Sequence, residues 1–125
     1  MNQIIHTDKA PAAIGPYSQA VRTGNLLFVS GQIPLDPATG AFAGEDITSQ
    51  TRQALMNVQA ILEEAGYALT DVVKATVLLA DIADFAAMNA VYAEFFKTNC
   101  PARAAFAVKD LPKGAKVEIE VIAGK

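Results

Sequence analysis

The 125-residue chain has little cysteine, histidine and charge, and each shortage excludes a class of protein. A single cysteine, Cys100, cannot form an intrachain disulfide, which fits a reducing compartment rather than a disulfide-stapled secreted domain. Charged residues make up only 18% of the chain against 52% hydrophobic residues, which excludes a disordered chain. The net charge of −3 lacks the basic excess of a nucleic-acid binder, so we expect no nucleic-acid partner.

Long apolar runs are also missing. The longest, Val72 to Ala80, is interrupted by Lys74 and is far shorter than a membrane-spanning helix needs. The N-terminal residues show neither the basic nor the apolar segment of a signal peptide. These absences predict a soluble cytoplasmic protein with no membrane partner. The length predicts a single domain over residues 1–125, and the low charged fraction predicts that part of its surface is hidden in an oligomer.

Turn residues and hydrophobic spacing predict an α+β fold. Strand-like runs over 17–22 and 26–30 flank a Gly24-Asn25 turn, the pattern of a hairpin. Apolar positions three and four residues apart predict helices over 47–65 and 84–97, the first with Asp46 as N-cap and Gly66 just past its end. Further strands are predicted over 72–79, 103–109 and 116–123. Two helices cover only one face of a sheet, so we expect another subunit on the other face.

The last two strands carry the most informative polar side chains. Side chains alternate along a strand, which places Glu118 and Glu120 on one face, and Arg103 on the same face as two alanines of its own strand. Because Phe106 is expected to lie under the helices, Arg103 on the opposite face of the same strand is expected on the open face, beside both glutamates. A structural salt bridge between Arg103 and Glu118 or Glu120 is slightly favoured there over a ligand site. We expect Glu120 to lie deeper and Glu118 to pair near the surface with Lys116.

Other polar residues allow simpler explanations. Ser30 and Gly31 lie where a predicted strand ends. A glycine there would let a ligand approach the backbone closely, but an ordinary loop is the favoured explanation of this pair. Tyr17 is either a binding donor or a core ring with an exposed tip. Asn89 interrupts an apolar helix stripe and is expected to bond a loop backbone. With His6 as the only histidine, neither a Ser-His-Asp triad nor a metal site is predicted.

Six segments together resemble the Rid family, also called the YjgF family, of imine deaminases. The resemblance runs from about Ile4 to Ala123 and places the chain with the arginine-containing, catalytically competent branch. The segments are Ala10–Gln19, Val29–Pro34, Gln53–Val58, Asn89–Phe96, Pro101–Ala105 and Val117–Ala123.

This resemblance implies a chorismate-mutase-like mixed sheet with two helices on one face, assembled as a homotrimer with active sites between subunits. It implies hydrolysis of 2-imino acids or their enamines (2-iminobutanoate, 2-iminopropanoate) to 2-oxo acids and ammonia, which detoxifies intermediates of pyridoxal-phosphate enzymes. No cofactor and no metal are implied. Arg103 would bind the substrate carboxylate and Glu120 would position water. The other residues implied to line the site are Tyr17, Ser30, Gly31, Asn89 and Ala105.

Two alternatives remain open at this stage. A non-enzymatic trimer could bind small carboxylates as a sensor or hold unfolding proteins as a chaperone. The chain could also deaminate another small metabolite, such as a pyrimidine-breakdown or aminomuconate intermediate. In some family members a cysteine lies two residues after the arginine, where this chain has Ala105, so Cys100 is not expected to take that cysteine's role.

Overall fold

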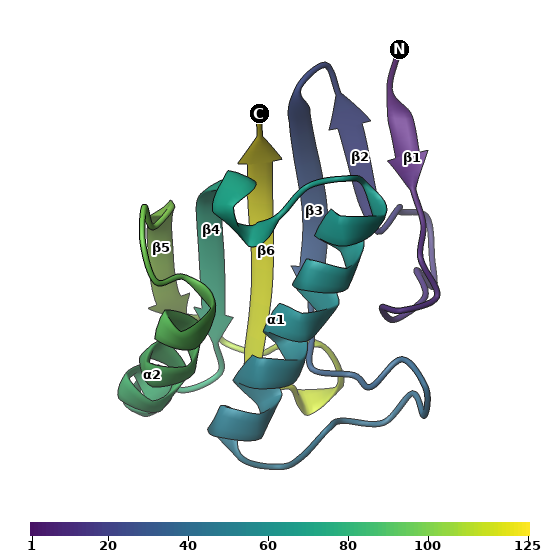
Figure 1. Ribbon diagram of the computed structural model, residues 1–125. Coiled ribbons are helices and arrows are strands. Elements are labelled where there is room, and N and C mark those ends of the chain that lie inside the picture. The colour runs from purple at the N-terminus through teal and green to yellow at the C-terminus, as the bar shows by residue number, and fades with distance from the viewer.

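The computed structural model, which describes all residues 1–125, is a six-stranded mixed sheet with two α-helices packed in front of it (Figure 1). The sheet order is β1-β2-β3-β6-β4-β5. Strands β4 and β5 are parallel, and every other neighbouring pair is antiparallel. The elements are β1 (Gln3–Ile5), β2 (Ala20–Thr23), β3 (Leu26–Gln32), α1 (Ile47–Glu64), β4 (Val72–Leu79), α2 (Phe85–Phe95), β5 (Ala102–Ala107) and β6 (Val117–Gly124).

This architecture confirms the predicted α+β fold with both helices on one face (Figure 1). Strands β4 and β5 are joined through α2 as a βαβ unit. The short edge strand β1 was not among the predicted elements. Three 3₁₀ turns complete the fold, at Leu69–Asp71, Ile82–Asp84 and Pro112–Gly114.

Local signals account for the predicted boundaries that are confirmed. Thr23 pairs with Leu26, so the hairpin turn has two residues, and its first, Gly24, has φ +57°. Asp46 accepts a hydrogen bond from the backbone N–H of Ser49 at 3.0 Å, the usual way to satisfy the first turn of a helix. Gly66, with φ +81°, follows the end of α1.

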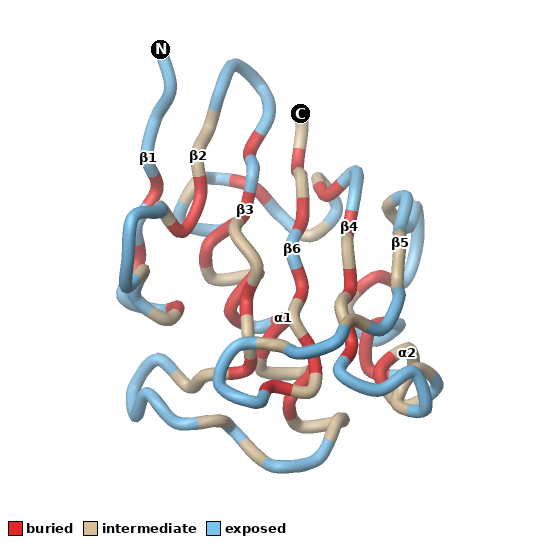
Figure 2. The backbone as a smooth tube through the Cα atoms, turned by 180° about the vertical axis from the view of Figure 1, so that it is seen from behind, coloured by how far each residue is buried: buried red, intermediate tan, exposed pale blue.

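Alternation along the central strands separates a core face from an open face, as the alternating colours of β3, β4 and β6 show (Figure 2). The apolar residues that point toward the helices are fully buried; on β6 they are Val117, Ile119, Val121 and Ala123. The opposite face has no helix over it and leaves Leu26, Phe28 and Phe106 more than 40% exposed. The sheet is therefore covered on one side only.

Phe106 lies on the open face, so the prediction that it packs under the helices is wrong. The register pairs Arg103 with Ala75 and Ala105 with Val77, both of which are buried beneath the helices. Strand β5 consists mostly of alanines, which fit either face. The phase of its alternation is therefore set by its register with β4 rather than by its own residue pattern.

Candidate active site

Ser30 and Gly31 form a bulge in β3. Val29 pairs with Val121 and Gln32 pairs with Ile119, so two residues of β3 lie opposite the single residue Glu120 of β6. Bulges of this kind occur often beside active sites, because they re-aim a strand and interrupt its ladder. A Cβ at Gly31 would overlap the carboxylate of Glu118. Glycine is therefore required here to admit a neighbouring carboxylate.

Glu118 lines a cavity of about 360 Å³ together with Tyr17, Gly31 and Lys113. The cavity has an apolar wall that includes Ile14 and Ile33, and Glu118 is its only carboxylate. Burial, with a further contribution from the negative charge of Glu120, raises the pKa of Glu118 above the usual glutamate value. A carboxylate with a raised pKa that faces a cavity is well suited to accept a proton from water.

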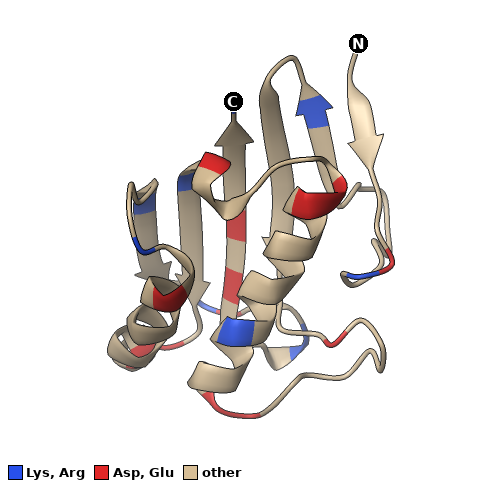
Figure 3. Ribbon diagram, viewed as in Figure 1, with Lys and Arg blue, Asp and Glu red and all other residues tan.

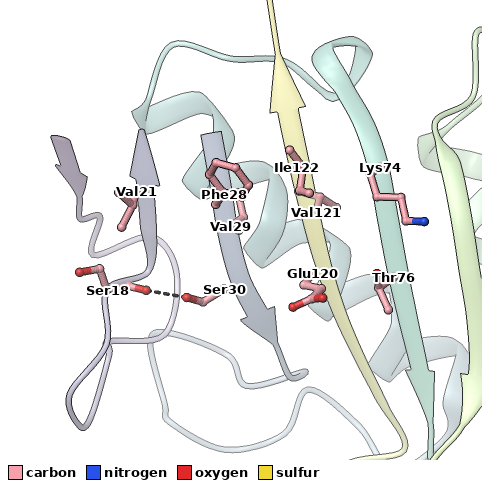
Figure 4. A pocket seen from close by; sticks show the side chains of 10 residues that line it. All are labelled: Ser18, Val21, Phe28, Val29, Ser30, Lys74, Thr76, Glu120, Val121 and Ile122. Carbon is pink, nitrogen blue, oxygen red and sulfur yellow. Dashed lines mark hydrogen bonds between the residues drawn. The ribbon is translucent and has the colours of Figure 1, made fainter. Parts of the chain in front are cut away.

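Glu120 faces a different hollow, on the open face of the sheet. This hollow of about 350 Å³ also contains Ser30, Lys74 and Thr76 (Figure 4). The Ser30 hydroxyl donates to the backbone carbonyl of Ser18 at 2.6 Å, so it ties β3 to the segment that carries Tyr17 (Figure 4). Ser30 lies within β3, not at the strand end that the sequence suggested, and its hydroxyl has a backbone partner.

The predicted depths of the two glutamates are reversed in the structure. Glu120 is exposed, whereas Glu118 is partly buried and makes no salt bridge to Lys116. The one Lys or Arg ion pair of the chain lies elsewhere, between Arg52 and Glu94, and His6 is within hydrogen-bond distance of Asp8. The reason is that the bulge and Gly31 open a recess beside Glu118, and the sequence pattern of β6 gives no sign of it.

Arg103 lies on the helix side of the sheet, against α2. Its guanidinium donates to the Asn89 side-chain oxygen at 2.7 Å and lies over the rings of Tyr92 and Phe85, 4.7 and 5.6 Å from their centres. Asn89, Tyr92, Cys100 and Arg103 line a groove of about 330 Å³. No carboxylate pairs with Arg103. Most donors of its planar fork remain free for an anionic ligand.

Two predictions about Arg103 and Asn89 are therefore wrong. Arg103 neither shares a face with Glu118 and Glu120 nor forms a salt bridge with them. Asn89 binds the guanidinium rather than a loop backbone. Ala105 follows Arg103 on the same strand face and is partly buried against the core.

The structure consequently divides the expected site residues into separate groups. Arg103 on β5 pairs with Ala75 of β4, and Glu118 on β6 pairs with Leu78 of β4. The Cα atoms of Arg103 and Glu118 are therefore two strand spacings apart across the sheet and three residues apart along the strands. That separation is about 14 Å, and the two side chains point to opposite faces. A 2-imino acid, in which the carboxylate carbon is bonded to the imine carbon, is too small to contact both groups within one subunit.

Gln19 is a polar residue whose role the sequence did not indicate. It is 2% exposed, its side-chain oxygen accepts from the Thr7 backbone N–H at 2.7 Å, and its amide donates to the carbonyls of Thr7 and Pro11. These bonds hold the segment that forms one wall of the Glu118 cavity. One feature of the sequence could have indicated this role: Gln19 is an amide inside a strand-like run, and an amide that is buried there needs hydrogen-bond partners.

The distribution of charged, metal-ligating and apolar residues bears on other kinds of binding by this chain. Lys and Arg are scattered over several elements rather than gathered on one face (Figure 3). No three His, Cys, Asp or Glu side chains lie close enough together to bind a metal ion. Neither helix combines the length and the apolarity required to cross a membrane.

Comparison with known proteins places these features in a family. A family model described as Endoribonuclease L-PSP matches residues 7–125. The RutC family protein PH0854 of Pyrococcus horikoshii is 57% identical over all of this chain and 99% of its own. The 2-iminobutanoate/2-iminopropanoate deaminase of Capra hircus is 54% identical over 98% of this chain and 90% of its own.

Solved structures agree. The Rid family protein YyfA of Yersinia pestis superimposes with a TM-score of 0.97 at 47% identity, over 100% of both chains. Escherichia coli TdcF with bound serine gives a TM-score of 0.95 at 45% identity, over 98% of both chains. The chain therefore has the α+β fold of these proteins, a mixed sheet with two helices on one face. The chain belongs to the Rid (YjgF/RutC) family, as its sequence motifs predict.

Proposed function

We propose that this protein hydrolyses short 2-imino acids, 2-iminobutanoate and 2-iminopropanoate, to 2-oxo acids. The imino acid and one water give the 2-oxo acid and ammonia. The observation that carries the proposal is a pair of uncompensated charges: the Arg103 guanidinium and the Glu118 carboxylate each face a cavity and lack an ion-pair partner. The 54% identity to a protein named as a deaminase of these substrates supports it.

Arg103 would bind the substrate carboxylate. Its planar fork matches a carboxylate with two parallel hydrogen bonds, and Asn89 already holds one side of the guanidinium. The TdcF structure with bound serine supports a small amino-acid-like ligand in this family. Fixing the carboxylate places the adjacent imine carbon at a defined distance from the water that attacks it.

Glu118 would accept the proton of that water. The water oxygen bonds to the imine carbon while Glu118 takes one water proton and passes it to the nitrogen, so the C=N bond becomes a C–N bond in a carbinolamine. Glu118 would then move the carbinolamine hydroxyl proton to the nitrogen, the C–N bond would break, and the products would be the 2-oxo acid and ammonia. The family resemblance implied that Glu120 positions the water, but Glu120 is exposed and lies outside the cavity of Tyr17 and Gly31. The geometry therefore favours Glu118, with Glu120 acting through its charge on the pKa of Glu118.

One complete site would need two subunits, because Arg103 and Glu118 of one chain are too far apart for a single substrate. A homotrimer with three such sites would meet this need and would also cover the exposed open face around Leu26, Phe28 and Phe106. Light scattering tests the assembly: a trimer mass at micromolar concentration is expected, and a monomer mass would contradict it.

The reaction is tested by a coupled assay in which a threonine dehydratase generates the imine. Adding the protein should accelerate 2-oxobutanoate formation, and Arg103→Ala should abolish the acceleration. Arg52→Ala is the matched control, because Arg52 forms an exposed pair with Glu94 on the helix surface. No acceleration by the wild-type trimer would contradict the proposal. Full activity of Arg103→Ala would contradict the role given to this arginine.

A further inference from the structure

One face of α2 is occupied by contacts with Arg103. Phe85, Asn89 and Tyr92 are spaced by four and three residues, which places them in a row along the helix. All three reach the guanidinium: Asn89 by a hydrogen bond at 2.7 Å, Tyr92 and Phe85 by their ring faces. The nearest ring centre is that of Tyr92, at 4.7 Å. The helix thus forms a floor beneath an otherwise free arginine.

Tyr92 is unusual within this row. It is only 5% exposed, and its hydroxyl is buried without a hydrogen-bond partner, an arrangement that costs stability. Because the hydroxyl has no hydrogen bond, it does not fix the position of the Tyr92 side chain. The ring is held between Phe96, whose centre is 4.6 Å away, and the guanidinium of Arg103.

The phenol also leaves the charge of Arg103 uncompensated. Burial raises the pKa of Tyr92 above its usual value and outweighs the opposing effect of the arginine, so the phenol stays neutral. A neutral ring face attracts the guanidinium without using its N–H donors, which a carboxylate in the same place would occupy. Those donors remain available along the groove lined by Asn89, Cys100 and Arg103.

We propose that Tyr92 is the positioning residue for Arg103: its ring face holds the guanidinium flat, Asn89 fixes one side, and the free side is presented to an incoming carboxylate. This inference rests on the carboxylate-binding role proposed for Arg103. An arginine held in one orientation loses less conformational freedom on binding, so the affinity for the carboxylate depends on the ring. Tyr92 would act through Arg103 and would not touch the reacting atoms.

The test compares ring-deleting and ring-keeping variants with 2-oxobutanoate as the carboxylate probe and its neutral amide as the control probe. Tyr92→Leu should weaken 2-oxobutanoate binding by about threefold to thirtyfold, the range of an ordinary cation–π contact, and leave the amide unaffected. In the same variant, the KM for the imino acid should rise as the carboxylate binds less tightly, while kcat changes less. Tyr92→Phe keeps the ring and should bind like the wild type. Tyr92→Met replaces the leucine variant if that variant does not fold.

Val91→Ala controls for the loss of buried volume, because Val91 is a buried α2 residue outside the Arg103 groove. It should keep the wild-type preference for the carboxylate over the amide. An unchanged preference in the ring-deleting variants, or an equal loss in Val91→Ala, would overturn the role of Tyr92.

NMR of the ligand-free protein separates this inference from the proposed function. Ring contact shifts the Arg103 side-chain protons upfield in wild type and Tyr92→Phe, and Tyr92→Leu should reduce this shift to the smaller part that the more distant Phe85 ring contributes. A shift of wild-type size in Tyr92→Leu contradicts the positioning role. A wild-type protein without any carboxylate preference contradicts the function of Arg103 instead, whatever the NMR result.

Discussion

Replacing Glu118 by glutamine removes the proposed proton acceptor and almost nothing else. Glutamine has nearly the same shape, so the recess above Gly31 stays filled and the cavity keeps its walls. Glu118 is the only carboxylate that lines this cavity, so no neighbouring group there can take over the proton. We therefore expect the full contribution of a general base to be lost, a fall in kcat of about 10² to 10⁴, or roughly 3–5 kcal/mol in activation free energy.

Glu120→Gln is the matched variant, two residues away on the same strand face. It should retain kcat at neutral pH. Because the charge of Glu120 helps to raise the pKa of Glu118, its removal should move the acid limb of the activity profile to lower pH. In the wild type, activity should rise with pH through a pKa above the usual glutamate value, as Glu118 ionises.

Steady-state kinetics in the coupled dehydratase assay between pH 5 and 8 measures both variants, and 2-oxobutanoate binding shows whether the Arg103 half of the site is intact. The expected pattern is low kcat with retained binding for Glu118→Gln. The reasoning is refuted if Glu120→Gln abolishes turnover while Glu118→Gln is mild. That result would give the water-handling role to Glu120, as the sequence alone suggested.

Stability gives a second readout for Glu118. A group whose pKa is raised by folding binds its proton more tightly in the native state, so its contribution to stability falls as pH rises from the unfolded pKa through the folded one. Above that window the buried charge destabilises the fold. Glu118→Gln should therefore have the higher melting temperature at neutral pH and lose this advantage in acid. Equal melting temperatures at both pH values would argue against a desolvated carboxylate.

Three further substitutions test the surroundings of the site. Gly31→Ala should fold but lose most activity, because the new methyl group displaces the Glu118 carboxylate; wild-type kinetics would contradict this. Gln19→Leu should lower the free energy of unfolding by about 2–4 kcal/mol, since buried backbone groups of Thr7 lose their partner, and urea unfolding measures the loss. A stability equal to wild type would show that the buried network is dispensable. Cys100→Ser should leave imine hydrolysis nearly unchanged, because the one hydrogen bond of its thiol goes to the Phe96 carbonyl, at 3.5 Å, and a serine hydroxyl can make the same bond; an inactive but folded variant would contradict that expectation.

Much of the fold could be predicted because its signals are local. The three- and four-residue spacing of α1, its Asp46 cap and the Gly24 turn each depend on neighbouring residues only. The face of β5 could not be predicted in this way. Its alanines carry no preference, and the pairing with β4 beneath α2 decides which side Arg103 takes.

The site was predicted as a set of residue types rather than as a geometry. The family motifs indicated Arg103, Asn89, Tyr17, Ser30 and Gly31, and the structure places each at a cavity or beside one. Which glutamate is recessed depends on a bulge in a different strand, which the alternation of β6 does not reveal. The separation of the arginine from the recessed glutamate follows from sheet order, which is a property of the whole fold.

In the proposed assembly, one subunit supplies the arginine and another the carboxylate of each site. Subunits carrying Arg103→Ala and subunits carrying Glu118→Gln should each be inactive alone. When the two are unfolded together and reassembled in equal amounts, random pairing gives about a quarter of the sites an intact arginine and an intact glutamate, so about a quarter of wild-type activity should return. Recovery of that fraction supports the shared site. Trimers that contain both variants and stay inactive would contradict it.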